Sequence, residues 1–503
     1  MKYFEIASSF LLKVSGCKPE KIIFLGFLLF PVYIRTGIPK PLFMKWMFGI
    51  FMVFFSIFAC AQQGREKYSS FDYMWMNIGN EGFSAGHAIY TSLAFSPADG
   101  QPCVAFCDDS LSGKAALMKF NGIDWVYVGT RGFSAMGAAY TSLAFSPTDS
   151  LPYVAYQDAV NYYEFASVMK YNGTAWVYAG SEGFSPSIAE YTSLAFSSYG
   201  QPFVAFRDFE NGVSVMRLSG NVWAQVGNRQ FSAGDAEYIS LAINPADKQP
   251  WVVYEDKADS GKATVMRFNG AGWVNAGPAG FTADSVWFTS IAFNPSDGLA
   301  YVAYADFSSP YKAEVMKFDS THWVSVGDSG ASGGPVKWVS LAFDPEGHPC
   351  VSYSDLEDPG NRATVRKYDG NNWIGIGNVD FSAGQVLYTS LAFRPSNGQA
   401  YLAYQDWGNS GKLTVMYFNG SVGTGDIQPT RPIIYPNPSS GKITIKTSNS
   451  GRFSILNFNS QELISGPVTG PATQIDISGL SPGVYVVRVT GENSVMAEKV
   501  IKP

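Results

Sequence analysis

The sequence has few of the residues on which enzyme chemistry usually depends. Its three histidines, His87, His322 and His348, fall at different positions of the repeat described below, so they are not expected to cluster. No Gly-x-Ser-x-Gly, His-Glu-x-x-His, phosphate-loop or EF-hand pattern is present. The net charge is −6 and no run rich in lysine or arginine occurs, which argues against nucleic acid or an anionic membrane as a partner. We predict no cofactor and no metal site.

Cysteine is scarce as well. Of the five cysteines, Cys17 and Cys60 lie in an apolar N-terminal region, and Cys103 and Cys350 occupy the same position in two distant repeats. Cys103 and Cys107 are four residues apart on one expected strand, about 13 Å at the rise of a strand, which is too far for a disulfide bond. We therefore expect three buried free thiols, no disulfide framework and no zinc motif.

Aromatic residues and glycine are abundant: aromatics make up 15% of the chain, which has 51 glycines, and charged residues are only another 15%. This composition favours short strands and tight turns. The pattern Trp-Val-x-x-Gly, Gly-Phe-Ser-Ala-Gly, Tyr-Thr-Ser-Leu-Ala-Phe, Pro-Tyr-Val-Ala-Tyr-x-Asp, Val-Met-Lys-Phe-Asn-Gly recurs about every 50 residues, which indicates a repeat fold. Its tryptophans are Trp75, Trp125, Trp176, Trp223, Trp273, Trp323 and Trp373.

Each repeat contains four strand-like runs separated by turn signals. In the first repeat they are residues 90–95, 102–107, 114–120 and 124–128, with Asn-Gly before the last. The pattern predicts an all-β fold, a seven-bladed β-propeller with four-stranded blades. The array opens with a lone fourth strand at residues 74–78 and ends without one, so the first strand is expected to complete the last blade and leave no open edge. A monomer is expected.

Most recurring residues are interpreted as structural. Serine alternates with leucine in the first strand, as at Ser92 and Leu93, so that crowded inner strands can nest, and the tryptophans are expected to fill the wider outer gaps. An aspartate ends the second strand of every repeat and is interpreted as a turn cap. The alternative is a ring of cation or ligand contacts. The seven aspartates are Asp108, Asp158, Asp208, Asp256, Asp306, Asp355 and Asp406.

The repeats resemble kelch-like bacterial propellers, whose blades read Tyr-Thr-Ser-Leu-Ala, Tyr-Val-Ala-Tyr-x-Asp, Val-Met-Lys-Tyr-Asn-Gly and Trp-Val. The resemblance covers residues 73–420. It implies the fold but not the function, because propellers include both binding proteins and enzymes.

The N-terminal region resembles an export signal. Residues 46–58 are uninterrupted and apolar, a lysine precedes them, and Ala59-Cys60-Ala61 follows, which is typical of a signal peptide at residues 44–61. A retained membrane anchor and a lipoprotein site at Cys60 are the alternatives. Because a signal peptide belongs at the N-terminus, we expect that residues 1–43 lie upstream of the true start. Residues 62–72 would form a short leader.

A second domain follows the repeats. Residues 421–432 read as a linker, and alternating apolar runs in residues 433–503 predict a small Ig-like β-sandwich. The motifs Tyr-Pro-Asn-Pro-Ser-Ser-Gly, Leu-Ser-Pro-Gly-Val-Tyr-Val-Val-Arg-Val and Glu-Lys-Val-Ile-Lys resemble the C-terminal sorting domain of the type IX secretion system of Bacteroidota. The resemblance implies that the secretion machinery is a partner of the tail and that the protein is released or held on the outer surface. An ordinary Ig-like module is the alternative.

One face of the ring is the expected binding surface. Successive loops alternate between the two faces, and the loops between second and third strands share a face with the connections between blades. There the repeats differ most, and there we place the ligand contacts. These residues are Tyr162, Tyr163, Trp287, Tyr311 and Trp407.

The ligand is expected to be a glycan or a protein, bound by a secreted or surface propeller. A glycan-acting enzyme is the alternative, because Glu190 and Glu237 occupy equivalent positions in adjacent repeats, with Asp235 beside them. Glycoside chemistry needs two carboxyl groups roughly 5–9.5 Å apart. A structural surface protein is a third reading.

Overall fold

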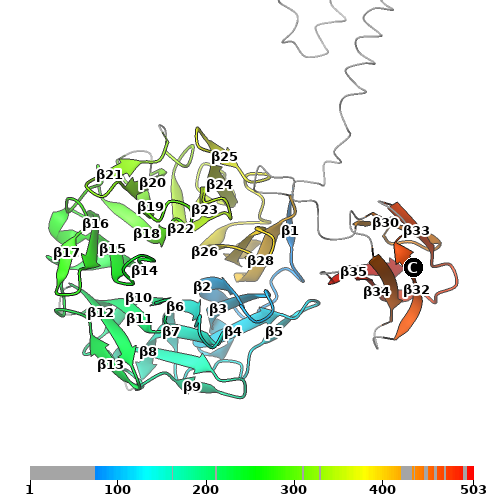
Figure 1. The fold of residues 1–503 in the computed structure, drawn as a ribbon, viewed down its shortest axis with the longest axis horizontal. Helices are drawn as coiled ribbons and strands as arrows, with labels where there is room; N and C mark the ends of the chain where they lie inside the picture. The colour runs from blue at the N-terminus through cyan, green and yellow to red at the C-terminus, as the bar shows by residue number, and fades with distance from the viewer. Residues whose placement is uncertain are drawn as a thin grey trace, which may run out of the picture. The chain divides into compact units, whose positions relative to one another are not determined.

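The structure is a computed structural model (Figure 1). It describes residues 74–160, 163–209, 212–308, 311–327, 330–420, 433–435, 437–446, 451–457, 461–468, 472–490 and 495–503. The predictions for the signal peptide, the leader and the linker lie outside the described residues, as do Cys17, Cys60 and Tyr162.

The repeats form seven four-stranded antiparallel sheets, which we call blades 1 to 7 in chain order. Their inner strands contact one another in succession all the way round, including the last with the first, so the sheets close into a ring (Figure 1). The fold is therefore the predicted seven-bladed β-propeller.

The strands have the following bounds. Blade 1 contains β2 (Ala88–Phe95), β3 (Pro102–Asp108), β4 (Lys114–Phe120) and β5 (Trp125–Tyr127). Blade 2 contains β6 (Ala138–Phe145), β7 (Pro152–Val160), β8 (Tyr163–Tyr171) and β9 (Trp176–Tyr178). Blade 3 contains β10 (Ala189–Phe196), β11 (Pro202–Asp208), β12 (Gly212–Ser219) and β13 (Val222–Gln225). Blade 4 contains β14 (Ala236–Ile243), β15 (Pro250–Asp256), β16 (Lys262–Phe268) and β17 (Trp273–Asn275).

Blade 5 contains β18 (Val286–Phe293), β19 (Ala300–Asp306), β20 (Ala313–Phe318) and β21 (Trp323–Ser325). Blade 6 contains β22 (Val336–Phe343), β23 (Pro349–Asp355), β24 (Ala363–Tyr368) and β25 (Trp373–Gly375). Blade 7 contains β26 (Val386–Phe393), β27 (Ala400–Asp406), β28 (Lys412–Phe418) and, from the start of the array, β1 (Trp75–Asn77). Three single 3-10 turns are η1 (Asp109–Leu111), η2 (Lys257–Asp259) and η3 (Trp407–Asn409).

Blade 7 joins the two ends of the array. Strand β1 pairs antiparallel with β28, and Trp75 stands opposite Phe418. The backbone N–H of Ile78 donates to Val415 O at 3.0 Å, and that of Asn419 donates to Met74 O at 3.1 Å. In Figure 1 the blue β1 accordingly lies beside the yellow β28. The lone fourth strand thus covers the edge that β28 would otherwise leave open.

The serine of each inner strand forms a hydrogen bond to the next blade in addition to being small. Ser92 Oγ accepts from the backbone N–H of Leu143 at 2.9 Å, and Ser390 Oγ accepts from that of Leu93 at 2.9 Å. The five other junctions have the same bond, at 3.0 to 3.2 Å. These seven bonds form a closed ring, so the serine side chains satisfy backbone donors that face the neighbouring blade.

An aromatic residue precedes this serine by two positions and adopts a left-handed backbone. The φ angles are between 50° and 57°, in a bulge where the pairing with the second strand shifts. Neighbouring rings contact one another with centroids 4.2 to 5.4 Å apart, and the last contacts the first. We call this set the inner aromatic ring: Tyr90, Tyr140, Tyr191, Tyr238, Phe288, Trp338 and Tyr388.

The repeat tryptophans join the blades at their outer edges. In each junction the indole N–H donates to a backbone carbonyl of the preceding blade at 2.7 to 2.8 Å. In six junctions the indole also stacks on the phenylalanine of Gly-Phe-Ser, as Trp176 does on Phe133 at 3.8 Å. Gly79 has φ +77° and its Cβ position lies 3.0 Å from Trp125, so glycine is required where the chain passes the indole.

The described cysteines, Cys103, Cys107 and Cys350, are free and buried. Burial raises the pKa of the Cys103 thiol to about 12, so the thiol stays protonated and unreactive at neutral pH. Among the residues with described placement, no helix is long and apolar enough to cross a membrane.

The tail forms a small β-sandwich of two antiparallel sheets. One has the order β29-β30-β33 and the other β32-β31-β34-β35. The apolar core between them includes Ile443, Ile455 and Val487. The bounds are β29 (Ile433–Tyr435), β30 (Lys442–Lys446), β31 (Gly451–Leu456), β32 (Glu462–Val468), β33 (Ala472–Asp476), β34 (Gly483–Thr490) and β35 (Val495–Lys502).

Candidate functional site

One face of the ring carries the loops between second and third strands together with the connections between blades. We call it the loop face. Hydrogen bonds join the two kinds of segment: Asp109 N–H donates to His87 O at 3.1 Å, and Phe307 N–H donates to Ser285 O at 3.0 Å. Trp407 N–H donates to Gln385 O at 2.9 Å in the same way. The loops after the second strands and the connections between blades are therefore neighbours on this face.

Most of the repeat aspartates accept a backbone N–H two residues further on. Asp108, Asp256 and Asp406 cap η1, η2 and η3. The carboxylates of Asp306 and Asp355 accept from the N–H groups of Ser308 and Glu357 at 2.6 and 3.0 Å. All five side chains thus hold the loop that follows the second strand.

The two remaining repeat aspartates have other contacts. Asp208 accepts two bonds from the Arg229 guanidinium at 2.6 and 2.7 Å, and residues 210 and 211 of the loop that follows it are outside the described residues. Asp158 is fully buried, and neither carboxylate oxygen has a hydrogen-bond partner among the described residues. The physical reason is that β7 and β8 continue beyond Asp158, which pairs with Phe165 in a longer hairpin, so no capping loop follows it there.

The carboxylates proposed for glycoside chemistry lie where β10 and β14 begin, and both form ion pairs. Arg207 donates from Nη1 to Glu190 at 2.6 Å, and from Nε and Nη2 to the two oxygens of Asp235 at 2.8 and 2.7 Å. Lys257 Nζ lies 3.3 Å from Glu237 and 2.7 Å from Glu255. We call these six residues the mouth cluster.

Glu255 is the most buried member of the mouth cluster. Its side chain is 4% exposed, and Oε2 has no hydrogen-bond partner among the residues described. Burial raises the pKa of its carboxyl group, although the Lys257 ammonium opposes this shift. Four carboxyl groups share two cations in the mouth cluster.

Aromatic side chains lead from the inner aromatic ring across blade 5. The ring of Tyr238 lies 6.2 Å from that of Trp287, Trp287 lies 4.3 Å from Phe307, and Phe307 lies 4.7 Å from Tyr311. Trp287 is half-buried and Tyr311 is 47% exposed. We call Trp287, Phe307 and Tyr311 the aromatic track. Such a row of rings suits the apolar faces of a sugar or of a peptide side chain.

The other residues expected on the binding face do not join this track. Trp407 is 47% exposed on η3 in blade 7, where its ring lies 5.5 Å from that of His87. Tyr163 begins β8, and its side chain is outside the described part, as is the whole of Tyr162. The structure therefore brings together two of the five predicted residues, Trp287 and Tyr311.

Sequence reasoning missed Phe307, Arg207 and Lys257. Phe307 directly follows a repeat aspartate, in a loop that differs between repeats. The sequence could therefore have predicted its position on the loop face, but not its contact with Trp287. Arg207 and Lys257 are cations in repeat positions that are otherwise mostly uncharged, which was the available signal. Their carboxylate partners in the neighbouring segments become evident only in the folded ring.

One group of described residues has the ligand types and spacing for a metal ion. Ligand atoms of Asp344, Glu346 and His348 all lie within 4.8 Å of one another. However, Asp344 already contacts the ammonium of Lys367 at 3.2 Å and the ring of His348 at 2.9 Å. A buried lysine in this position supplies the positive charge that a metal ion would bring.

Comparisons with known proteins identify the tail. Residues 433–503 match the family described as the secretion system C-terminal sorting domain. That domain marks proteins of the type IX secretion system, as the tail motifs predicted, so the protein is exported to the cell surface or the extracellular space. A search of the curated proteins found no match.

Solved structures with a similar arrangement are distant in sequence. A protein of unknown function from Dyadobacter fermentans is 13% identical, with 69% of this chain and 97% of that chain covered and a TM-score of 0.40. AofleA from Arthrobotrys oligospora is 11% identical, with 61% and 91% covered and a TM-score of 0.42. An ulvan lyase is 13% identical, with 69% and 96% covered and a TM-score of 0.45. The fold assignment rests on the hydrogen-bonded blades themselves.

Proposed function

We propose that this protein is an extracellular binding protein whose loop face holds a glycan or protein ligand beside the mouth of the ring. The observation that carries the proposal is the aromatic track, which runs from the inner aromatic ring to the exposed Tyr311. Exposed aromatic side chains in contact with one another on a loop face are typical of ligand recognition rather than of folding. In this proposal the ring resembles kelch-like propellers, residues 44–61 direct export, and the tail is read by the secretion machinery.

The alternative hypothesis, a glycan-acting enzyme, has weaker support. Glycoside chemistry needs one carboxyl group that donates a proton and a second that attacks or activates water. Glu190 and Glu237 are each held in an ion pair, with Arg207 and Lys257 respectively. The mouth cluster therefore resembles an ordered charge network more than an acid–base pair.

A glycan array probed with the purified full chain tests the proposal. The variant Trp287→Ala/Tyr311→Ala should lose binding by at least about tenfold, because stacking on one ring contributes roughly 1–1.5 kcal/mol. The matched control is Ile123→Ala, in the turn between β4 and β5 on the opposite face, where the side chain is 67% exposed. Equal loss in the control, or turnover of a bound glycan that Glu190→Gln abolishes, would contradict a binding role for the loop face.

A further inference from the structure

The residues directly before the inner aromatic ring form a second row around the mouth of the propeller. The first strands begin at the loop face, so this row belongs to that face. Each member pairs with a residue of the second strand, as Trp287 does with Ala305 and Lys337 with Ser354. All seven are half-buried or exposed. We call this set the mouth row: Ile89, Ala139, Glu190, Glu237, Trp287, Lys337 and Leu387.

The mouth row has two unlike halves. Blades 7, 1 and 2 carry its three aliphatic members, whereas blades 3 to 6 carry its three charged members and Trp287. In blades 5 and 6 the inner aromatic ring changes as well, because Phe288 and Trp338 stand where the five other blades have tyrosine. The rings of Phe288 and Trp338 are 4.7 Å apart. Trp287 and Lys337, which precede them, therefore hold equivalent positions on neighbouring strands.

Lys337 differs from the other charged members of the mouth row because it has no ionic partner among the described residues. Glu190 lies 2.6 Å from Arg207, and Glu237 lies 3.3 Å from Lys257. Lys337 is exposed, and within the described part of the chain its ammonium forms neither an ion pair nor a hydrogen bond. The charge of the mouth row that is left for a ligand is thus positive.

The described acidic residues of the neighbouring loop in blade 6 do not contact Lys337. Asp358 forms an ion pair with Arg362 at 2.8 Å, and Glu357 lies against Gly334. The residue across from Lys337 on β23 is an uncharged serine. An anionic group that approaches this ammonium can therefore form a charge-assisted hydrogen bond without displacing a described partner.

We propose that the loop face binds an acidic glycan, with a sugar ring against Trp287 and a carboxylate or sulfate group of the same chain on Lys337. The assignment rests on the proposed function of the loop face, and it adds the charge of the ligand and the residue that contacts this charge. A flexible lysine suits an anionic group, and the flat face of an indole suits the apolar face of a sugar.

The arrangement of charges favours a glycan over an acidic peptide. Trp287 in blade 5 stands between Glu237 in blade 4 and Lys337 in blade 6. A glycan has hydroxyl donors for the carboxylate on one side of Trp287 and an anionic group for the ammonium on the other. A peptide rich in acidic residues would bring like charges to Glu237.

The test uses the full chain and two acidic polymers, polygalacturonate and dextran sulfate, each beside its neutral counterpart, carboxyl-reduced polygalacturonate and dextran. Biolayer interferometry measures the affinities at two salt concentrations. At least one acidic polymer should bind at least about tenfold more tightly than its neutral counterpart, and this preference should shrink at high salt because the ion pair is exposed.

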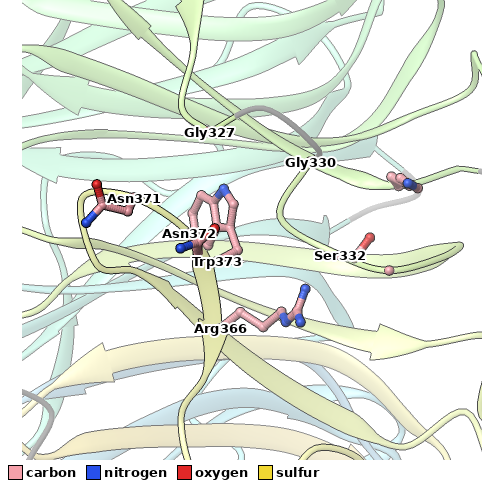
Figure 2. Close-up of a pocket in the computed structure, with 9 residues that line it drawn as sticks. Gly327, Gly330, Ser332, Arg366, Asn371, Asn372 and Trp373 are labelled. Atoms are coloured by element: carbon pink, nitrogen blue, oxygen red, sulfur yellow. The ribbon is translucent and has the colours of Figure 1, made fainter. Parts of the chain in front are cut away.

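Two variants that each remove one cation from the same pair of blades assign the preference to a residue. Lys337→Gln should weaken binding of the acidic polymer by about 5- to 20-fold and leave binding of the neutral polymer unchanged. The matched control is Arg366→Met, which restores the methionine of the six other repeats. Figure 2 shows Arg366 beside Trp373, the tryptophan of an outer edge, so this variant should bind as the unchanged protein does.

Failure of the acidic ligand and failure of the loop face give different results. If neutral and acidic polymers bind equally and Trp287→Ala abolishes both, the loop face binds glycans but the acidic assignment is wrong. If Trp287→Ala/Tyr311→Ala binds the acidic polymer fully, the loop face itself is not the site. Absence of binding to both acidic polymers, full binding by Lys337→Gln, equal loss in Arg366→Met, or tighter binding of polyglutamate would also overturn the assignment.

Discussion

Replacing Asp158 with asparagine should stabilise the ring at neutral pH, although all seven repeats have aspartate at this position. The Asp158 carboxyl group is fully buried and, among the described residues, neither oxygen has a hydrogen-bond partner. Burial raises its pKa from 3.8 to about 6 and the nearby Glu182 adds to the shift, while the hydroxyl groups of Ser167 and Tyr156, which lie outside hydrogen-bond geometry, oppose it. The folded state therefore disfavours the ionised form, whereas the unfolded chain does not.

The magnitude follows from the difference between the two pKa values. A difference of about two pKa units corresponds to roughly 3 kcal/mol at most. The ionisation of Asp158 lowers the free energy of unfolding by this amount. The cost is fully present above pH 6. It disappears as the pH falls toward 3.8, because in that window the folded state binds the proton before the unfolded state does. Asp158→Asn should thus gain about 1–3 kcal/mol at pH 7.5 and nothing near pH 3.8.

Urea unfolding followed by tryptophan fluorescence, at several pH values, measures this difference directly. The matched control is Asp256→Asn at the same repeat position, where the carboxylate accepts from Ala258 N–H at 3.1 Å and from Thr264 Oγ1 at 2.9 Å. The free energy of unfolding of that variant should fall by about 1–3 kcal/mol at neutral pH, because the Ala258 N–H and the Thr264 hydroxyl lose their charged acceptor. If Asp158→Asn is destabilising at pH 7.5 as well, the buried carboxylate is not the liability described.

Three other outcomes are expected. Trp75→Ala should lower the free energy of unfolding by about 3–5 kcal/mol, because it removes a buried indole from the strand that closes the ring. In the same unfolding assay, Trp407→Ala should change the free energy of unfolding by less than about 0.5 kcal/mol. Ser92→Ala should cost about 1–3 kcal/mol by leaving the Leu143 N–H without its acceptor, and an unchanged midpoint would contradict the ring of serine bonds. Deletion of residues 433–503 should leave a ring with an unchanged melting profile that accumulates inside the cell envelope, and normal export of this truncation would refute the role of the tail.

The architecture could be predicted because every repeat contains the same sequence signals. The blades were predicted from Asn-Gly turns and alternating apolar residues. Ring closure was predicted from the offset between the two ends of the array. The start of the first strand was placed at Tyr90, but β2 begins at Ala88, because the left-handed bulge at Tyr90 breaks the alternation on which strand boundaries depend.

Interactions between blades could not be predicted in the same way. Ser92 was interpreted as merely small, yet its partner Leu143 lies in the next repeat, and only the ring places one beside the other. The repeat aspartates were expected to behave alike, but β7 and β8 continue past Asp158, so this aspartate does not end its strand. Ala331 and Arg366 both depart from the repeat, and the hydrogen bond between them is a property of the folded chain.

The pairing of β1 with β28 makes the integrity of the ring depend on both ends of the repeat array. A polypeptide that stops before β28, or that has lost β1 to a protease, retains six complete blades and an exposed edge in the seventh. Closing the ring of such a chain would bring together ends more than three hundred residues apart, and no strand pairing would offset the loss of chain entropy. A full free energy of unfolding therefore indicates that the repeat array is whole. A truncated chain exposes an open strand edge, which is prone to proteolysis and aggregation.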